Sequence, residues 1–154
     1  MKWLNLFSNI NAMIFLLLTA LYFYQFVYMG VGLYTKHKKY PKTNKQLRYA
    51  IMICARNEEN VIGDIIHSLK NQTYNKDKFD IFVLADNCTD HTYEKAIELG
   101  AYAYTRENTK EVGKGYALNT LYHNIQKDFG DNYDAYIVFD ADNIIDKNFL
   151  TEMN

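Results

Sequence analysis

Residues 136–143 read YIVFDADN, an apolar run that ends in two aspartates. The run at 136–139 predicts a buried strand, because strands covered on both faces are continuously hydrophobic. Asp140 and Asp142 then lie where that strand ends. Two carboxylates at the carboxyl end of a parallel strand can hold Mg²⁺ or Mn²⁺ against a diphosphate, since these cations prefer oxygen ligands. The alternative is an ordinary turn, in which Asp and Asn are common.

Strand and helix patterns alternate along the chain from residue 49 onward. Four apolar runs predict strands at 49–55, 79–85, 101–105 and 135–139. Apolar residues at helical spacing predict helices at 61–69, 92–99 and 118–129. Asn60 is the expected N-cap of the first helix. This alternation with short connections predicts an α/β domain that contains a parallel sheet with right-handed crossovers.

A polar cluster follows three of the four predicted strands. The clusters are RNEE at 56–59, DNCTD at 86–90 and DAD at 140–142. In open parallel sheets, ligands bind outside the carboxyl ends of the strands. Three clusters at three strand ends therefore predict a binding site along that edge of the sheet. A single cluster would not be enough for this prediction.

Four side chains in or near these clusters have candidate roles. Asp86 can accept the N3–H of a uracil ring or bind a ribose hydroxyl, unless it is only a strand-end turn residue. Glu58 can lie along the edge of a base, or it can interact favourably with the dipole of the next helix. Asp90 is expected to cap the helix that follows it. Lys114, between two glycines, can pair with a phosphate, although the P-loop pattern is absent.

The first part of the chain has the composition of a membrane span. Residues 10–34 are almost wholly apolar, and no charged residue lies between Lys2 and Lys36. A helix of this length measures about 37 Å, enough to cross a hydrocarbon core of about 30 Å. A cleaved signal peptide is the alternative, but its apolar core is shorter and is followed by small residues.

A basic segment follows this span. Its cations are Lys36, Lys38, Lys39, Lys42, Lys45 and Arg48. The positive-inside rule places that side of the membrane in the cytoplasm. We therefore expect a cell-membrane protein with one N-terminal anchor at 1–35, a basic linker at 36–48 and a cytoplasmic domain at 49–154.

The charge of the predicted domain excludes one class of partner. From Tyr49 onward the chain carries ten Lys and Arg and all 18 Asp and Glu, a net charge of −8. Nucleic acid is not an expected partner, because its binding depends mainly on cations that neutralise phosphates. Cys54 and Cys88 fit reduced cytosolic thiols, and no Cys/His spacing resembles a zinc site.

Four motifs in this order resemble glycosyltransferase family 2. They are ARNEE at 55–59, LADNCTD at 84–90, GKGYALN at 113–119 and FDAD at 139–142. The resemblance covers about residues 50–154 and implies the nucleotide-binding half of a GT-A, Rossmann-like fold. It also implies an inverting transfer from a UDP-sugar to a glycan or lipid acceptor. An anchor followed by a cytosolic domain is similar to the membrane-bound branch that makes polysaccharides such as cellulose, hyaluronan and poly-N-acetylglucosamine.

The resemblance also implies roles for individual residues. The implied donor-binding residues are Ala55, Asn57, Glu58, Asp86, Lys114 and Asp140. Asp142, together with Asp140, is the implied ligand of Mg²⁺ or Mn²⁺. In the family the metal-bearing strand is interior and later elements cover its far side, so a chain that ends at Asn154 is expected to leave an edge and apolar surface of 135–139 unprotected.

The catalytic base of the family lies well downstream of the Asp-x-Asp motif, so we expect it beyond Asn154. The 154-residue chain is then an N-terminal fragment that binds donor and metal but transfers little sugar alone. Three alternatives remain open. One is a module that binds a nucleotide or nucleotide-sugar without turnover, and another is a phosphatase or response-regulator-like domain with Asp140 as phosphoacceptor. The third is a purely structural membrane protein, which would leave the three polar strand ends unexplained.

Overall fold

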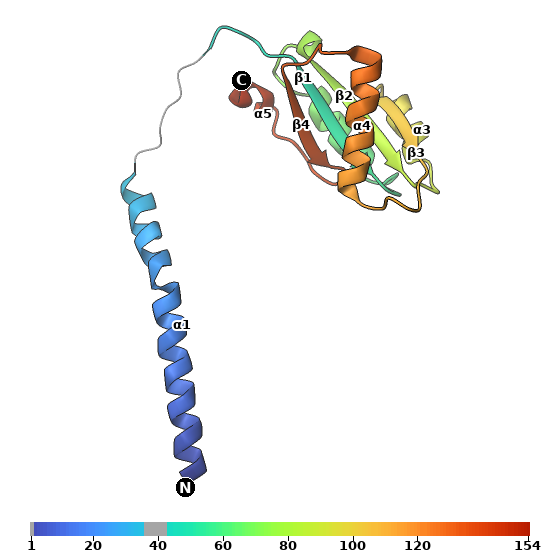
Figure 1. Ribbon diagram of the computed structural model, residues 1–154. Helices are drawn as coiled ribbons and strands as arrows, with labels where there is room; N and C mark the ends of the chain where they lie inside the picture. Colours follow the sequence, from blue (N-terminus) through green and yellow to red (C-terminus); the bar gives the residue numbers. More distant parts are fainter. Residues whose placement is uncertain (1, 36–42) are drawn as a thin grey trace. The chain divides into compact units, whose positions relative to one another are not determined.

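The computed structural model describes residues 2–35 and 43–154, which belong to two compact units, Met1–Lys42 and Thr43–Asn154. The first unit consists of helix α1 (Lys2–Tyr34), in which Asn5–Tyr34 is long and apolar enough to cross a membrane (Figure 1). Its large side chains are exposed along its length, for example Phe15 and Leu33. Within the described residues α1 is therefore the one candidate membrane span. Four of the six cations expected in the linker lie outside the described residues.

The second unit contains a four-stranded sheet in which all strands are parallel. Its strands are β1 (Tyr49–Ala55), β2 (Phe79–Asp86), β3 (Tyr102–Arg106) and β4 (Ala135–Asp140). The spatial order is β3-β2-β1-β4, so the chain crosses over between β3 and β4 (Figure 1). The parallel sheet that the apolar runs predict is confirmed, with strand ends that differ by at most one residue.

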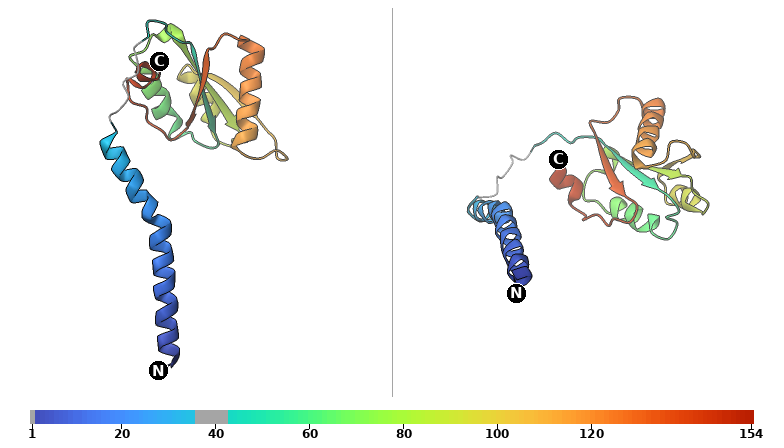
Figure 2. Two further views of the ribbon diagram at one scale, coloured as in Figure 1. Left: turned by 60° about the vertical axis from the view of Figure 1, so that its left-hand side comes forward. Right: turned by 60° about the horizontal axis from the view of Figure 1, so that its bottom comes forward.

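Helices cover both faces of this sheet. They are α2 (Ile62–Lys70), α3 (Thr92–Glu98), α4 (Lys114–Phe129) and α5 (Phe149–Met153), with a short 3-10 helix η1 (Lys76–Lys78). Figure 2 shows α4 on one face and α2 and α5 on the other. Alternate β1 residues serve the two cores: Ile51 and Ile53 pack toward α2, whereas Ala50 and Met52 pack toward α4. A strand covered on both faces is apolar throughout, which explains the continuous run at 49–55.

Three local predictions were wrong. Strand β4 is not buried within the described residues: it pairs only with β1, and Val138 is 44% exposed, so the unprotected edge expected of this strand is observed and the buried run is not. Helix α2 has Val61, not Asn60, at its N-cap, and no side chain caps it. Helix α4 begins at Lys114 rather than at 118, because its first turn contains little apolar surface to produce a pattern.

Candidate functional site

The loops after the four strands meet at the carboxyl edge of the sheet. The two non-glycine residues with positive φ among the described residues are both there: Asn57 (φ 56°) follows β1 and Asn87 (φ 52°) follows β2. Asparagine tolerates this left-handed conformation better than most residues. The side chain of Asn57 accepts a hydrogen bond from Thr89 N (2.7 Å), so the loops after β1 and β2 are joined. The edge predicted from the polar clusters is thus a connected structure.

Asp86 and Arg106 form a buried ion pair at this edge. Asp86 ends β2, and the parallel register places it beside Arg106 at the end of β3. Arg106 Nη1 donates to Asp86 Oδ1 (2.7 Å), and both side chains are at most 10% exposed. Asn87 Nδ2 donates to the same oxygen (3.1 Å). Both bonds use Oδ1, so Oδ2 is the carboxylate oxygen that they leave for another donor.

Sequence reasoning did not identify Arg106. The predicted third strand stopped at residue 105, which assigned Arg106 to a loop. A cation next to a strand end was the available signal, but its pairing with Asp86 depends on the register between β2 and β3.

Lys114 and Asp140 come together on the other side of the site. Lys114 is the first residue of α4, and its ammonium group contacts Asp140 Oδ1 at the end of β4. Gly113 before it has a φ of 127°, which side chains rarely adopt, and a Cβ there would meet no other atom. Glycine is therefore needed for conformation rather than for space. Both partners are about half exposed, so the pair is open to competing ions.

Asp142 is exposed and lies two residues after Asp140. The described residues contain no group of three or more His, Cys, Asp or Glu side chains placed to hold a metal ion. Mg²⁺ and Mn²⁺, however, usually take one or two carboxylates together with phosphate and water. Two aspartates are as many carboxylates as such a cation usually takes, and they do not form a closed protein cage.

The remaining predicted residues lie at the end of β1 and on the loop after it. Glu58 N donates to Thr92 Oγ1 (2.9 Å), and the Glu58 carbonyl accepts the N–H groups of Val61 and Ile62 at the start of α2. The carbonyl of Ala55 accepts a bond from Cys88 Sγ (3.4 Å). The structure thus brings Ala55, Asn57 and Glu58 to the same edge as Asp86.

Asp90 has a structural role in this edge. Its Oδ1 accepts bonds from Thr92 N (3.1 Å) and Thr92 Oγ1 (2.6 Å), and its Oδ2 accepts Glu59 N (3.1 Å). Burial acts to raise the pKa of Asp90, but these hydrogen bonds outweigh it and hold the pKa below the ordinary value. Asp90 therefore ties the start of α3 to the loop after β1, as the sequence predicted for the helix.

Cys54 lies on β1 at the base of the site. It pairs in register with Asp140 on one side and with Leu84 on the other. Burial raises the pKa of the Cys54 thiol to about 11, with a smaller contribution from Asp86. The thiol is therefore protonated at neutral pH and acts as a packing residue, not as a nucleophile.

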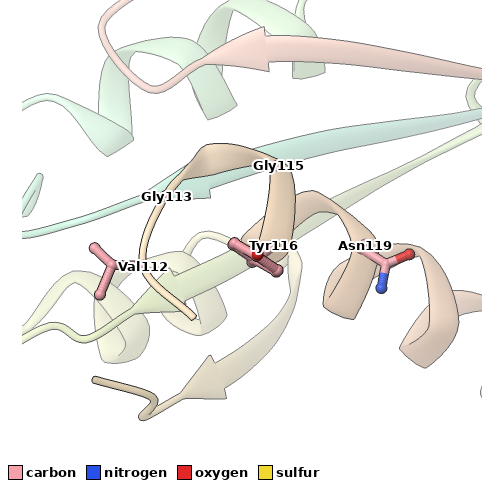
Figure 3. Close-up of a pocket in the computed structure, with 5 residues that line it drawn as sticks. All are labelled: Val112, Gly113, Gly115, Tyr116 and Asn119. Atoms are coloured by element: carbon pink, nitrogen blue, oxygen red, sulfur yellow. The ribbon is translucent and has the colours of Figure 1, made fainter. Parts of the chain in front are cut away.

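A hollow of about 460 Å³ adjoins the start of α4. Val112, Gly113, Gly115, Tyr116 and Asn119 line it, as Figure 3 shows. The lining is mostly apolar, and Val112 and Tyr116 are about half exposed. These residues flank Lys114 in the sequence, but the Lys114 ammonium group turns to Asp140 instead.

Comparison with known proteins assigns the family. Residues 50–153 match the model of glycosyl transferase family 2. The chain belongs to this family. The matched residues contain β2, β3 and β4, all of β1 except Tyr49, and every candidate site residue named above.

A curated relative agrees with this assignment, and two solved structures share the fold. The probable glycosyltransferase YdaM of Bacillus subtilis (strain 168) is 29% identical over 116 residues, which are 71% of this chain and 26% of YdaM. The mannosyltransferase PcManGT of Pyrobaculum calidifontis, in complex with GDP-Man and Mn²⁺, superposes with a TM-score of 0.58. It is 22% identical to this chain, and the alignment covers 71% of this chain and 32% of PcManGT.

Residues 1–349 of S. aureus TarS, in complex with UDP, superpose with a TM-score of 0.56 at 21% identity. The alignment covers 70% of this chain and 31% of that one. The likeness to both structures shows the fold: the four-stranded parallel sheet matches a GT-A, Rossmann-like fold, as predicted. The chain spans about a quarter to a third of the length of these relatives.

Proposed function

We propose that this chain carries the donor-binding part of a membrane-anchored family 2 glycosyltransferase. It uses a UDP-sugar with Mg²⁺ or Mn²⁺ and belongs to an inverting enzyme that acts on a glycan or lipid acceptor. The observation that carries the proposal is the convergence of two ion pairs, Asp86–Arg106 and Lys114–Asp140, on one edge of a GT-A sheet. TarS structures with UDP and with UDP-GlcNAc, and PcManGT with GDP-Man and Mn²⁺, support this class of donor.

The Asp86 end suits a nucleobase. The carboxylate is held by Arg106 and Asn87 through Oδ1, so Oδ2 can accept one N–H group of a base. The N3–H of uracil is the group that we assign to it. Asn57, Glu58 and the backbone at Ala55 belong to the loop that borders this position, and we assign them to the nucleoside as well.

The Lys114 end suits a diphosphate. Lys114 is a cation in the first turn of a 16-residue helix, whose amino end favours negative charge. Asp140 and Asp142 would hold the divalent ion, and Asp140 can also bind the ribose. A bound divalent cation offsets the negative charge that develops on a leaving diphosphate. No described residue is assigned as the base that deprotonates the acceptor.

The membrane assignment rests on α1 and on the basic segment at 36–48. We propose that α1 anchors the chain in the cell membrane, with residues 49–154 as the donor-binding domain in the cytoplasm. The branch that includes cellulose, hyaluronan and poly-N-acetylglucosamine synthases has this arrangement, which makes polysaccharide synthesis the preferred role.

Calorimetry with UDP and Mn²⁺ on the chain in detergent micelles tests the proposal. We expect the wild type to bind UDP only weakly without Mn²⁺, and Asp142→Ala to lose at least about tenfold in Mn²⁺-dependent affinity, the equivalent of about 1.4 kcal/mol. Asp131→Ala is the matched control, because it removes an exposed carboxylate just before β4, away from the site. Equal UDP affinity in wild type and Asp142→Ala would show that the metal assignment is wrong.

A further inference from the structure

Asn87 occupies a central position between the two strands that carry the Asp86–Arg106 pair. Its backbone N–H donates to Arg106 O (2.7 Å), and its Nδ2 donates to Asp86 Oδ1 (3.1 Å). The side chain also makes a two-way contact with the backbone of Asn108: Oδ1 accepts from Asn108 N (2.8 Å), and Nδ2 donates to Asn108 O (3.2 Å). One half-buried residue therefore contacts the aspartate, the arginine backbone and the loop after β3.

The loop after β3 in turn fixes the guanidinium group. Asn108 Oδ1 accepts the N–H groups of Lys110 (2.9 Å) and Glu111 (3.0 Å). This fold of the loop presents the Glu111 carbonyl to Arg106 Nη2 at 2.6 Å. Both terminal nitrogens of Arg106 are then held: Nη1 donates to Asp86 and Nη2 donates to the Glu111 carbonyl. Displacement of Asn108 would therefore move the Glu111 carbonyl and release one side of the guanidinium group.

The backbone of Asn87 adds a second requirement. Its φ of 52° lies in the left-handed region, which asparagine and glycine adopt more readily than other residues. Asparagine is the one residue type that combines this conformation with both an amide donor and a carbonyl acceptor on a short side chain. Glycine keeps the conformation but loses the three side-chain bonds, so it separates the two contributions.

We propose that Asn87 is a positioning residue that supports binding of the nucleobase at this site by fixing Asp86 and Arg106 together. This inference rests on the proposed function, since it assumes that Asp86 receives the base. The Lys114–Asp140 end shares none of the Asn87 contacts, so loss of Asn87 affects recognition of the base and leaves recognition of the diphosphate intact.

The test compares UDP with inorganic pyrophosphate, each with Mn²⁺, on the full chain in detergent micelles by calorimetry. For Asn87→Gly we expect UDP affinity to fall at least about tenfold, while pyrophosphate affinity stays within about twofold of the wild type. The matched control is Tyr133→Phe, which removes the 2.7 Å bond from Tyr133 to Asp80 at the opposite edge. It should lower stability to urea and change neither affinity.

Asn108→Ala disturbs the same hydrogen bonds from the loop after β3. It provides a second test if Asn87→Gly does not fold. It removes the bonds that shape residues 108–111, and we expect a smaller loss of UDP affinity, about threefold, with pyrophosphate unchanged. The inference is overturned if UDP affinity is unchanged in the folded variants, or if UDP and pyrophosphate affinities fall equally. Failure of the wild type to bind UDP at all would instead overturn the proposed function and, with it, this inference.

Discussion

Strand β2 carries an aspartate near each of its ends, and both aspartates pair with an arginine. At the amino edge, Asp80 Oδ2 accepts Arg48 Nη2 (2.9 Å) and the Tyr133 hydroxyl (2.7 Å). At the carboxyl edge, Asp86 Oδ1 accepts Arg106 Nη1 (2.7 Å) and Asn87 Nδ2 (3.1 Å). The two carboxylates have the same chemistry, so the pairing itself does not mark either of them as functional.

The surroundings of the two pairs differ. The Arg48 side chain is 38% exposed, and its guanidinium carbon lies 5.1 Å from the centroid of the Tyr133 ring. These contacts hold the segment that enters β1 against the amino edge of the sheet. The Asp86–Arg106 pair is more deeply buried, yet it lies next to a left-handed asparagine and on the same edge of the sheet as the open Lys114–Asp140 pair. Irregular backbone and open charge next to a buried ion pair are typical of a binding site. The comparison teaches that the surroundings of an ion pair reveal its role better than its own geometry does.

Replacing each of the two arginines by alanine should give the largest difference, which is in the free energy of unfolding. Arg106→Ala leaves the buried Asp86 carboxylate without its cation and should cost about 3–5 kcal/mol of unfolding free energy. Arg48→Ala removes a partly exposed partner and should cost about 1 kcal/mol. Urea denaturation followed by circular dichroism measures both. Equal costs would show that the two pairs are equivalent and would remove the basis of the comparison.

Replacing each of the two aspartates by asparagine should give a smaller difference, which is in the affinity for UDP. Asp86→Asn removes a charged hydrogen-bond acceptor from the proposed base position and should weaken UDP binding by about 2 kcal/mol, or about 30-fold. Asp80→Asn makes the same chemical change at the other end of β2 and should leave UDP affinity within about twofold. Calorimetry at a temperature where both variants remain folded gives the two affinities. A larger loss of UDP affinity for Asp80→Asn than for Asp86→Asn would show that the site lies at the amino edge and not at the carboxyl edge.

The smallest effect distinguishes structural from ligand-binding carboxylates within the carboxyl edge. The hydrogen bonds that lower the pKa of Asp90 stabilise its ionised form, so their contribution is present above its unfolded pKa and is lost as the pH falls through the folded value. Asp90→Asn places an amide N–H against Glu59 N and should cost about 1 kcal/mol at pH 7. The difference from wild type should shrink as the pH falls below about 4, the ordinary value of an Asp carboxyl group, toward the lower pKa of the folded state.

The matching result for ligand binding is that Asp90→Asn leaves UDP affinity unchanged. A stability difference that stays constant from pH 7 to pH 3 would contradict the structural role of the Asp90 charge. A loss of UDP affinity larger than about threefold would place Asp90 in the binding surface itself.

Much of the fold was predictable from the sequence because its strands are buried by helices on both sides. The runs at 49–55 and 79–85 are continuously apolar for that reason, and they gave the parallel order and the carboxyl edge. Polar residues placed directly after such runs then located Asp86 and Asp140. These features are local, so a local pattern was sufficient to find them.

The features that were missed depend on contacts between distant segments. Arg106 becomes part of the site only through the register of β2 with β3, and Asn87 only through its bonds to Asn108. The predicted burial of 136–139 is not observed, because β4 pairs only with β1 in the described sheet and leaves the unprotected edge that was expected. The Asn60 cap failed because a polar residue before a helical pattern does not establish that its side chain reaches the free N–H groups.

Paramagnetic broadening by Mn²⁺ in the presence of UDP tests the claim that the carboxyl edge of the sheet holds the cation, because it reports which edge the ion occupies. Strand β4 extends for six residues, about 20 Å, so the two edges are far enough apart to be told apart. In the ¹⁵N-labelled chain, we predict that the amide signals of Lys114 and of residues 140–143 are lost first, while those of Arg48 and Tyr49 persist. Selective loss at Arg48 and Tyr49, or uniform broadening that UDP does not change, would contradict the claim.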